Sequence, residues 1–245
     1  MKRMLLLLLV LAAGAVQAEP TLDEILDQNI EARGGYEAWK SIDSAHMTGR
    51  MLMGGGIEAP FRLWFKRPDK VRMEFDVQGM TGVQAFDGET GWYVMPFMGK
   101  TEPEAMADDQ LKDIKEMADF DGILVDWEEK GHSVELVGTE DVEGTPTYRL
   151  DVTKANGDEN TIFLDQEYFL EIKTTAKTER QGNEVIVHTT IGDYKEVGDV
   201  IMPHSMEMQF EGLPMTQQLT IENVELNADV DDARFDMPEA VTSGE

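Results

Sequence analysis

The chain of 245 residues contains no cysteine, which excludes disulfide bonds, thiolate metal sites and cysteine nucleophiles. Basic residues are scarce: 21 Lys and Arg stand against 49 Asp and Glu, for a formal net charge of −28. So acidic a chain is unsuited to nucleic acid, which proteins bind by displacing counterions with basic side chains. The acids are spread along the chain, which favours adaptation to a saline habitat over a basic partner as their explanation. One basic cluster stands out, at residues 62–72.

Long apolar runs are also missing, apart from one at the start of the chain. Two basic residues precede the apolar run 4–16, and Val16-Gln17-Ala18 places small residues at a cleavage site. This order is typical of a secretory signal peptide, and about 13 residues cannot cross about 30 Å of hydrocarbon as a helix. We therefore expect a signal peptide at residues 1–18, a single domain at 19–245 and a periplasmic location. Loss of the two basic residues would change the net charge from −28 to −30.

Motifs of enzymes and metal sites are absent as well. No serine lies in a Gly-x-Ser-x-Gly elbow, and carboxylates are so abundant that a pair of them predicts nothing. His188 and His204 lie on predicted strands that can be neighbours, so a shared metal is a minor alternative. We expect no catalytic residues, no metal and no cofactor, with a lipid-modifying hydrolase as another minor alternative. The four histidines are far apart in the sequence: His46, His132, His188 and His204.

What the sequence does contain is a long series of short strand patterns. In residues 71–77, apolar residues alternate strictly with charged ones, which is typical of a half-buried strand. Similar segments recur about every 8–12 residues, separated by turn signals such as Asp87-Gly88 and Asn156-Gly157. We expect roughly ten or eleven strands in one sandwich or barrel. The segments are 44–53, 61–65, 71–77, 83–86, 92–95, 133–137, 147–153, 161–164, 170–175, 185–191, 200–202, 205–210 and 217–224.

Two segments break the strand pattern and predict helices. Residues 21–33 carry apolar residues at helical spacing, with Thr21 as the N-cap of a capping box and Gly34-Gly35 as a stop signal. Residues 102–130 predict an inserted helical segment with Pro103 in its first turn. The apolar residues that suit this second helix are Met106, Leu111, Ile114, Met117 and Ala118.

Large apolar side chains on single faces of adjacent predicted strands are candidates for the lining of a hydrophobic cavity. Methionine is flexible and polarizable, so it packs against irregular partners, including acyl chains. The inserted helical segment can cover such a face and open for a hydrophobic ligand. An ordinary core is the alternative for most of these residues. The candidate lining residues are Phe61, Leu63, Trp64, Phe65, Val71, Met73, Phe75, Trp92, Phe97, Met106, Met117, Met206 and Met208.

Two short motifs resemble those of the periplasmic outer-membrane lipoprotein carrier family. Residues 63–69 read Leu-Trp-Phe-Lys-Arg-Pro-Asp, similar to the family pattern Leu-Trp-x-Lys-Arg-Pro-Asn. Residues 87–92 read Asp-Gly-Glu-Thr-Gly-Trp, similar to Asp-Gly-Lys-Thr-x-Trp, and Pro96-Phe97 corresponds to a following Asn-Pro-Phe. The resemblance is best over residues 61–98. Residues 194–204 also resemble the wider lipoprotein-sorting-like (LolA/LolB-like) superfamily.

The resemblance implies a half-open antiparallel β-barrel whose apolar concave face, closed by helices, accepts lipid acyl chains. It further implies that Arg67 bonds groups of the lid and helps control its opening, which suits a guanidinium with five donors. A turn arginine beside Pro68 is the alternative. The implied protein is a non-enzymatic, monomeric carrier that moves lipoproteins or other lipids from an inner-membrane donor protein to an outer-membrane acceptor, with only transient membrane contact. A periplasmic lipid or lipoprotein sensor on the same fold is the alternative function.

Overall fold

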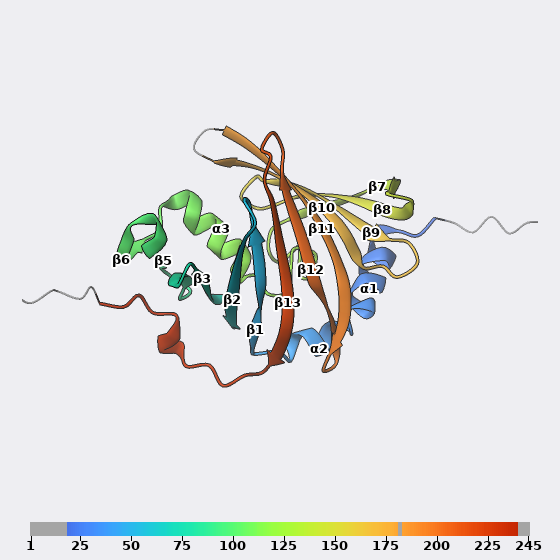
Figure 1. Cartoon of the computed structure of the whole chain (residues 1–245). Helices are drawn as coiled ribbons and strands as arrows, with labels where there is room; N and C mark the ends of the chain where they lie inside the picture. The colour runs from blue at the N-terminus through green and yellow to red at the C-terminus, as the bar shows by residue number, and fades with distance from the viewer. Residues whose placement is uncertain (1–18, 181–182, 240–245) are drawn as a thin grey trace, which may run out of the picture.

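A computed structural model describes residues 19–180 and 183–239, so the expected signal peptide lies outside the described residues. Thirteen antiparallel strands form one sheet that does not close on itself, in the order β6-β5-β4-β3-β2-β1-β13-β12-β11-β10-β9-β8-β7 (Figure 1). The predicted half-open antiparallel fold is confirmed, with more strands than expected.

The elements follow one another as a meander with few interruptions. Two strand-rich stretches are separated by one long helix and the turns that follow it. The strands are β1 (Ser44–Met53), β2 (Ile57–Lys66), β3 (Lys70–Val77), β4 (Met80–Phe86), β5 (Gly91–Met95), β6 (Lys100–Ala105), β7 (Ser133–Val142), β8 (Thr145–Thr153), β9 (Glu159–Asp165), β10 (Glu171–Arg180), β11 (Asn183–Val197), β12 (Val200–Phe210) and β13 (Thr216–Leu226). The helices are α1 (Leu22–Ala32), α2 (Tyr36–Lys40) and α3 (Asp108–Ala118), with short 3₁₀ turns η1 (Pro96–Met98) and η2 (Asp232–Arg234).

The first helix agrees with its prediction. The Thr21 hydroxyl accepts a hydrogen bond from the Glu24 backbone N–H, and the Glu24 carboxylate accepts one from the Thr21 N–H at 2.8 Å. This reciprocal pair satisfies two donors that the first turn of a helix otherwise leaves open. The short helix α2 was not expected, because five residues are too few to show a helical period.

The inserted segment 102–130 is less helical than predicted. Its first residues form the edge strand β6, so Pro103 lies in a strand and not in a helical first turn. An edge strand tolerates proline because it has a neighbouring strand on one side only, so a missing N–H on the open side costs no hydrogen bond of the sheet. Only residues 108–118 form α3, and residues 119–132 continue mainly as turns. None of the helices in the described ranges is long and apolar enough to span a membrane.

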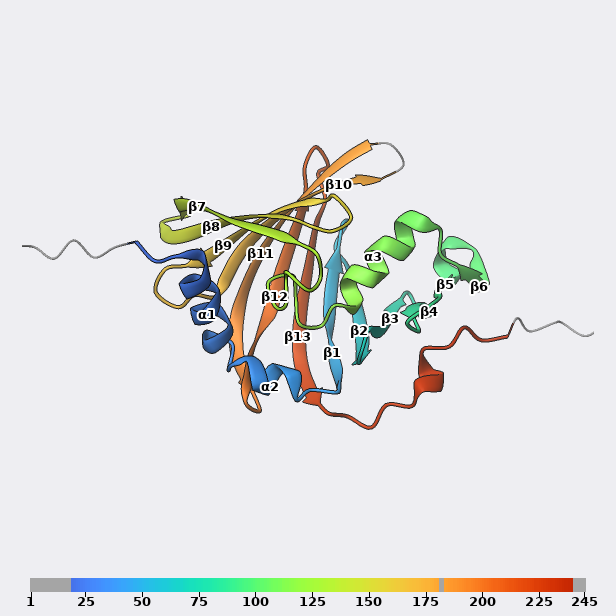
Figure 2. The same cartoon turned by 180° about the vertical axis from the view of Figure 1, so that it is seen from behind.

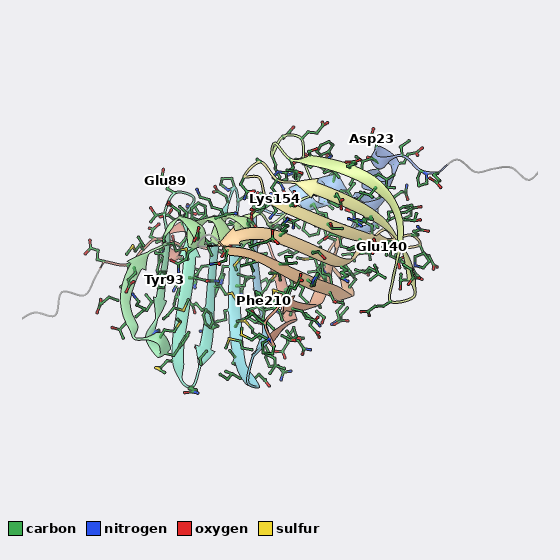
Figure 3. The ribbon with its side chains drawn as sticks, turned by 90° about the horizontal axis from the view of Figure 1, so that it is seen from above. Asp23, Glu89, Tyr93, Glu140, Lys154 and Phe210 are labelled. Atoms are coloured by element: carbon green, nitrogen blue, oxygen red, sulfur yellow. The ribbon has the colours of Figure 1, made fainter. Side chains whose placement is uncertain are left out.

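All three helices lie against the same side of the sheet, which we call the inner face; the opposite side is the outer face (Figure 2). Seen from above, the strands around Tyr93 and those around Glu140 run in different directions, so the sheet curves across its width (Figure 3). Two apolar clusters fill the inner side: one joins strands β1–β4, β12 and β13 to α2 and α3, and the other joins β7–β9 to α1.

Candidate functional site

The inner face of the β1–β4 region is a contiguous apolar surface. Phe61, Leu63 and Phe65 of β2 lie opposite Phe75, Met73 and Val71 of β3, and residues opposite each other in an antiparallel pair share a face. Five of these six are buried, and Phe65 is half-buried. The half-buried side chains that pack against the same cluster include four other predicted lining residues: Phe97, Met106, Met117 and Met206. Met208 shares the register of Met206 on β12 but lies outside the cluster.

Two predicted lining residues lie on the outer face instead, so Trp64 and Trp92 do not line the apolar inner surface. Trp64 is flanked by the inward-facing Leu63 and Phe65, and strand alternation turns it the other way. Trp92 donates a hydrogen bond from Nε1 to the Phe235 carbonyl oxygen at 2.8 Å, and both residues are buried. Large apolar side chains at these positions pack under another segment of the chain.

That segment is the C-terminal tail, residues 228–237, which no sequence pattern indicated. Phe235 is fully buried and packs with Trp64 and Val230. The basic cluster at 62–72 holds the tail: the ammonium of Lys66 lies 3.0 Å from an Asp232 carboxylate oxygen and also donates to the Val230 carbonyl oxygen at 2.7 Å. Lys66, Lys70 and Arg72 of the cluster therefore contact the C-terminal tail.

The inner face is covered by residues 106–132, which we call the lid. Ile114 and Ala118 of α3 are buried against the strands, and the Phe120 ring lies 5.2 Å from that of Phe65. The lid approaches the sheet closely at Gly91, where an added Cβ would lie 2.8 Å from the Met106 sulfur. Any side chain at this position would push the start of the lid away from β5.

One arginine ties the lid to the rest of the molecule. The Arg67 guanidinium makes a two-pronged contact with the Asp121 carboxylate, Nη1 to Oδ2 at 2.9 Å and Nη2 to Oδ1 at 2.6 Å. It also donates from Nε to the Ile42 carbonyl oxygen at 2.6 Å and from Nη2 to that of Trp39 at 2.9 Å. A planar fork of donors suits this arrangement, which a lysine could not reproduce. The contact joins three segments: the turn after β2, the end of α2, and the lid.

Asp121 is the residue on which these ties converge, and it is almost fully buried. Lys40 adds a third charged contact, with its ammonium 2.6 Å from Oδ2. Burial by itself raises the pKa of Asp121, but the hydrogen bonds and charges of Arg67 and Lys40 outweigh it and lower the pKa to about 2. The carboxylate is therefore ionised at any pH near neutrality, and the tie is permanent unless the lid itself moves. The sequence offered no signal for Asp121, which is one acid among many.

Two further ion pairs hold α3 to the turn between β8 and β9. The Lys112 ammonium lies 2.6 Å from an Asp158 carboxylate oxygen and donates to the Thr178 hydroxyl at 3.0 Å. The Lys154 ammonium lies 2.8 Å from a Glu116 carboxylate oxygen. In each pair one partner, Asp158 or Lys154, is nearly buried and the other, Lys112 or Glu116, is partly exposed, so each contributes on the order of 1 kcal/mol.

Between α3, the second part of the lid and this turn lies an open cleft of about 690 Å³. Its size falls within the range of small-molecule sites. Leu111 and Ile123 contribute apolar wall, and four lysines contribute their aliphatic stems with charged ends at the rim. The basic residues of the cleft are Lys112, Lys115, Lys130, His132 and Lys154.

The two histidines on neighbouring strands do not form a pair. His188 lies on β11 and shares a 3.0 Å hydrogen bond with the Thr175 hydroxyl, whereas His204 lies on β12, buried, 3.0 Å from the Met202 carbonyl oxygen. No group of three or more His, Asp or Glu residues in the described part of the chain could hold a metal ion.

No protein-family model and no curated protein matches the sequence. Solved structures do resemble this one. A LolA superfamily protein from Nitrosomonas europaea matches with a TM-score of 0.60 at 15% identity, covering 89% of this chain and 98% of the other. The chain has the LolA-superfamily fold.

Two other solved structures agree with this assignment. A domain from Vibrio parahaemolyticus, provisionally named an outer membrane lipoprotein-sorting protein domain, has a TM-score of 0.58 at 13% identity and covers 86% of this chain and 94% of its own. A DUF1329 family protein from Desulfovibrio piger has a TM-score of 0.58 at 10% identity, with 88% and 97% covered. At such low identity the likeness shows the LolA-like fold and leaves the function to be argued from the chain's own residues.

Proposed function

We propose that the protein is a non-enzymatic periplasmic carrier that shields acyl chains of lipoproteins or other lipids against the inner face of its sheet. The observation that carries the proposal is the contiguous apolar inner face beneath a lid that polar contacts tie down through Lys112, Glu116 and Asp121. The LolA-like fold supports the same interpretation.

When an acyl chain binds, the inner face would exchange its apolar contacts with the lid for apolar contacts with the chain. Burial of each methylene contributes about 0.8 kcal/mol, so half of a 16-carbon chain contributes about 6 kcal/mol before costs. Part of this gain offsets the contacts that Ile114, Ala118 and Phe120 give up when the lid moves. The net affinity is then moderate, which suits a carrier that must also release its cargo to an acceptor protein.

In the proposed function, Arg67 controls the opening of the lid. Two of its four hydrogen bonds end on the lid residue Asp121 and must break if residues 119–132 are to leave the sheet. The other two hold the guanidinium to the carbonyl oxygens of Trp39 and Ile42 and keep it in place. A donor or acceptor protein that offers the guanidinium another carboxylate or carbonyl group would favour the open lid. Asp121 is the matching residue on the lid side.

Native mass spectrometry tests the proposal directly. The protein, purified without detergent, is expected to retain acyl lipids, and delipidated protein is expected to take them up again. If no lipid is found before or after refeeding, the carrier function is wrong. Capture of a regulatory membrane protein from periplasm, in place of lipoproteins, would favour the sensor function.

Quenching of tryptophan fluorescence by brominated fatty acids tests where the lipid lies. Trp39 lies under the lid, 5.5 Å from the Phe120 ring, whereas Trp64 lies on the outer face. Trp39→Phe should therefore remove a large part of the quenching, and the matched variant Trp64→Phe should leave it unchanged. The opposite pattern would place the lipid on the outer face and exclude the inner one.

A further inference from the structure

Four hairpins lie side by side at one end of the sheet. In the strand order β6-β5-β4-β3-β2-β1-β13-β12, neighbours are joined in pairs by chain reversals, and antiparallel pairing brings all four reversals to the same end. We call these reversals together the hairpin edge; they comprise residues 51–57, 77–82, 94–99 and 212–218. None of these 26 residues is charged, although 29% of the whole chain is.

The hairpin edge exposes large apolar side chains. Met98 is 72% exposed, Leu213 56% and Met215 49%. Soluble proteins scatter such residues singly, and a concentrated set marks an interaction surface. Of the ten exposed large hydrophobic residues in the described ranges, six lie on this edge: Leu52, Ile57, Met80, Met98, Leu213 and Met215.

The individual tips touch one another and continue into the inner face. An added Cβ at Gly54 would lie 3.5 Å from a side-chain carbon of Met215, so the tips of β1–β2 and β12–β13 are adjacent. The Phe97 ring covers Gly82 in the same way and lies 5.7 Å from that of Phe75 in the inner cluster. Met53 also packs against this cluster from the edge. Through Phe97 and Met53, the apolar side chains of the edge therefore continue into the cluster of the proposed acyl site.

We propose that the hairpin edge docks the protein on the surface of an uncharged, zwitterionic lipid bilayer. Apolar side chains at loop tips insert at the boundary of headgroups and acyl chains, and their binding scales with the apolar area buried. The absence of charge at the edge, together with the net charge of −28, excludes attraction to anionic lipids. Protein interfaces rely on Trp, Tyr and Arg anchors, and the edge contains none of these.

Docking in this orientation would let an acyl chain pass between bilayer and inner face without crossing water. This transfer of acyl chains rests on the proposed carrier function, whereas docking on the bilayer does not.

Vesicle flotation tests the docking, with phosphatidylcholine vesicles and the chain from Glu19 onward, because the apolar run 4–16 would itself partition into lipid. The variant Met98→Ser/Leu213→Ser should reduce the vesicle-bound fraction at least about tenfold. The matched control Val137→Ser/Tyr168→Ser changes residues that are 50% and 61% exposed away from the edge, and it should bind like the unmodified protein. Equal losses in the two variants, or no binding by the unmodified protein, would overturn the proposal.

The cysteine-free chain permits a second readout that does not depend on the stability of the variants. An environment-sensitive dye on Met98→Cys should shift to the blue on these vesicles, and the same dye on Tyr168→Cys should not. A blue shift without vesicles, accompanied by dimers in sedimentation, would identify a second copy of the chain as the occupant instead. Docking with no acyl ligand in native mass spectrometry would leave the edge as proposed and exclude the carrier function; the reverse result would exclude the edge alone.

Discussion

The two ends of the sheet are covered in different ways. Over β7–β9, α1 packs Ile25 into a cluster of branched aliphatic side chains, with Leu150, Ile162 and Leu164 fully buried. Over β1–β4, the lid meets a cluster rich in Met and Phe, and its Leu124 also joins the first cluster. The cover by α1 is held by packing and one buried hydrogen bond from Asn29 to the Phe169 carbonyl oxygen, whereas the lid adds the charged contacts of Arg67, Asp121 and the ion pairs of α3.

Under the proposed function, this difference separates a structural cover from one that moves. Branched aliphatic side chains have few rotamers, so each packs well against few partners. The flexible Met side chain can pack well against several different partners. Under the proposed function, a partner protein offers Arg67 and Asp121 new polar contacts in place of those they lose when the lid opens. Under the proposed function, one sheet combines a fixed half and a half that exchanges ligand.

The strongest test changes one residue of each cover. Ile25→Ala should lower the free energy of unfolding by about 3 kcal/mol, since the side chain is fully buried among aliphatic neighbours. Met117→Ala, at a half-buried site of the lid itself, should cost about 1 kcal/mol and alter acyl binding instead. Urea unfolding measures the first effect and titration with a fatty acid the second; equal costs of unfolding would contradict the distinction between the covers.

Asp121→Asn tests the polar tie through its pH dependence. Because its folded pKa of about 2 lies below the ordinary value near 3.9, the carboxylate stabilises the fold fully above pH 4 and loses this effect as the pH falls toward 2. The variant should therefore be less stable than the unmodified protein by about 2 kcal/mol at pH 7. Urea unfolding at pH 7 and pH 3 should show the gap narrowing at the lower pH. A gap that is constant with pH would mean that the charge of Asp121 does not hold the lid.

Arg67→Leu should keep the fold and speed the release of cargo. Loss of the guanidinium contacts weakens the closed lid by about 1.4 kcal/mol, which corresponds to about tenfold faster transfer of a fluorescent fatty acid. Arg62→Leu is the matched control, because Arg62 pairs with Glu74 and Asp76 and does not contact the lid. Unchanged transfer in a well-folded Arg67→Leu variant would remove the gating role.

The smallest effect is expected for the ion pairs of α3. Lys112→Ala should raise the transfer rate about twofold to fivefold in low salt, and the difference should shrink in about 1 M salt, where charges are screened within a few ångströms. Lys177→Ala removes more exposed surface pairs that lie outside the lid and serves as the control. A salt-independent effect would assign the role of Lys112 to packing of its stem.

Local patterns predicted the elements that depend on local interactions. The capping box of Thr21 and the alternation in residues 71–77 are confirmed because each is encoded within a few neighbouring residues. The orientation of the Trp64 side chain toward the outer face was also predictable, since the inward-facing Leu63 and Phe65 flank it. Strand β6 was not, because a short edge strand of mostly polar residues has no period to detect.

The sequence by itself determined the antiparallel sheet, the opening helix, the apolar face of β2 and β3, and the resemblance to lipoprotein carriers. These follow from alternation, turn residues and short motifs, which act over a few positions. Only the tertiary structure decided that Asp121 meets Arg67, that the tail covers Trp64, and that four uncharged hairpins meet at one end. Such contacts join residues far apart in the chain, and their energy depends on the geometry of the assembled sheet, which no local pattern records.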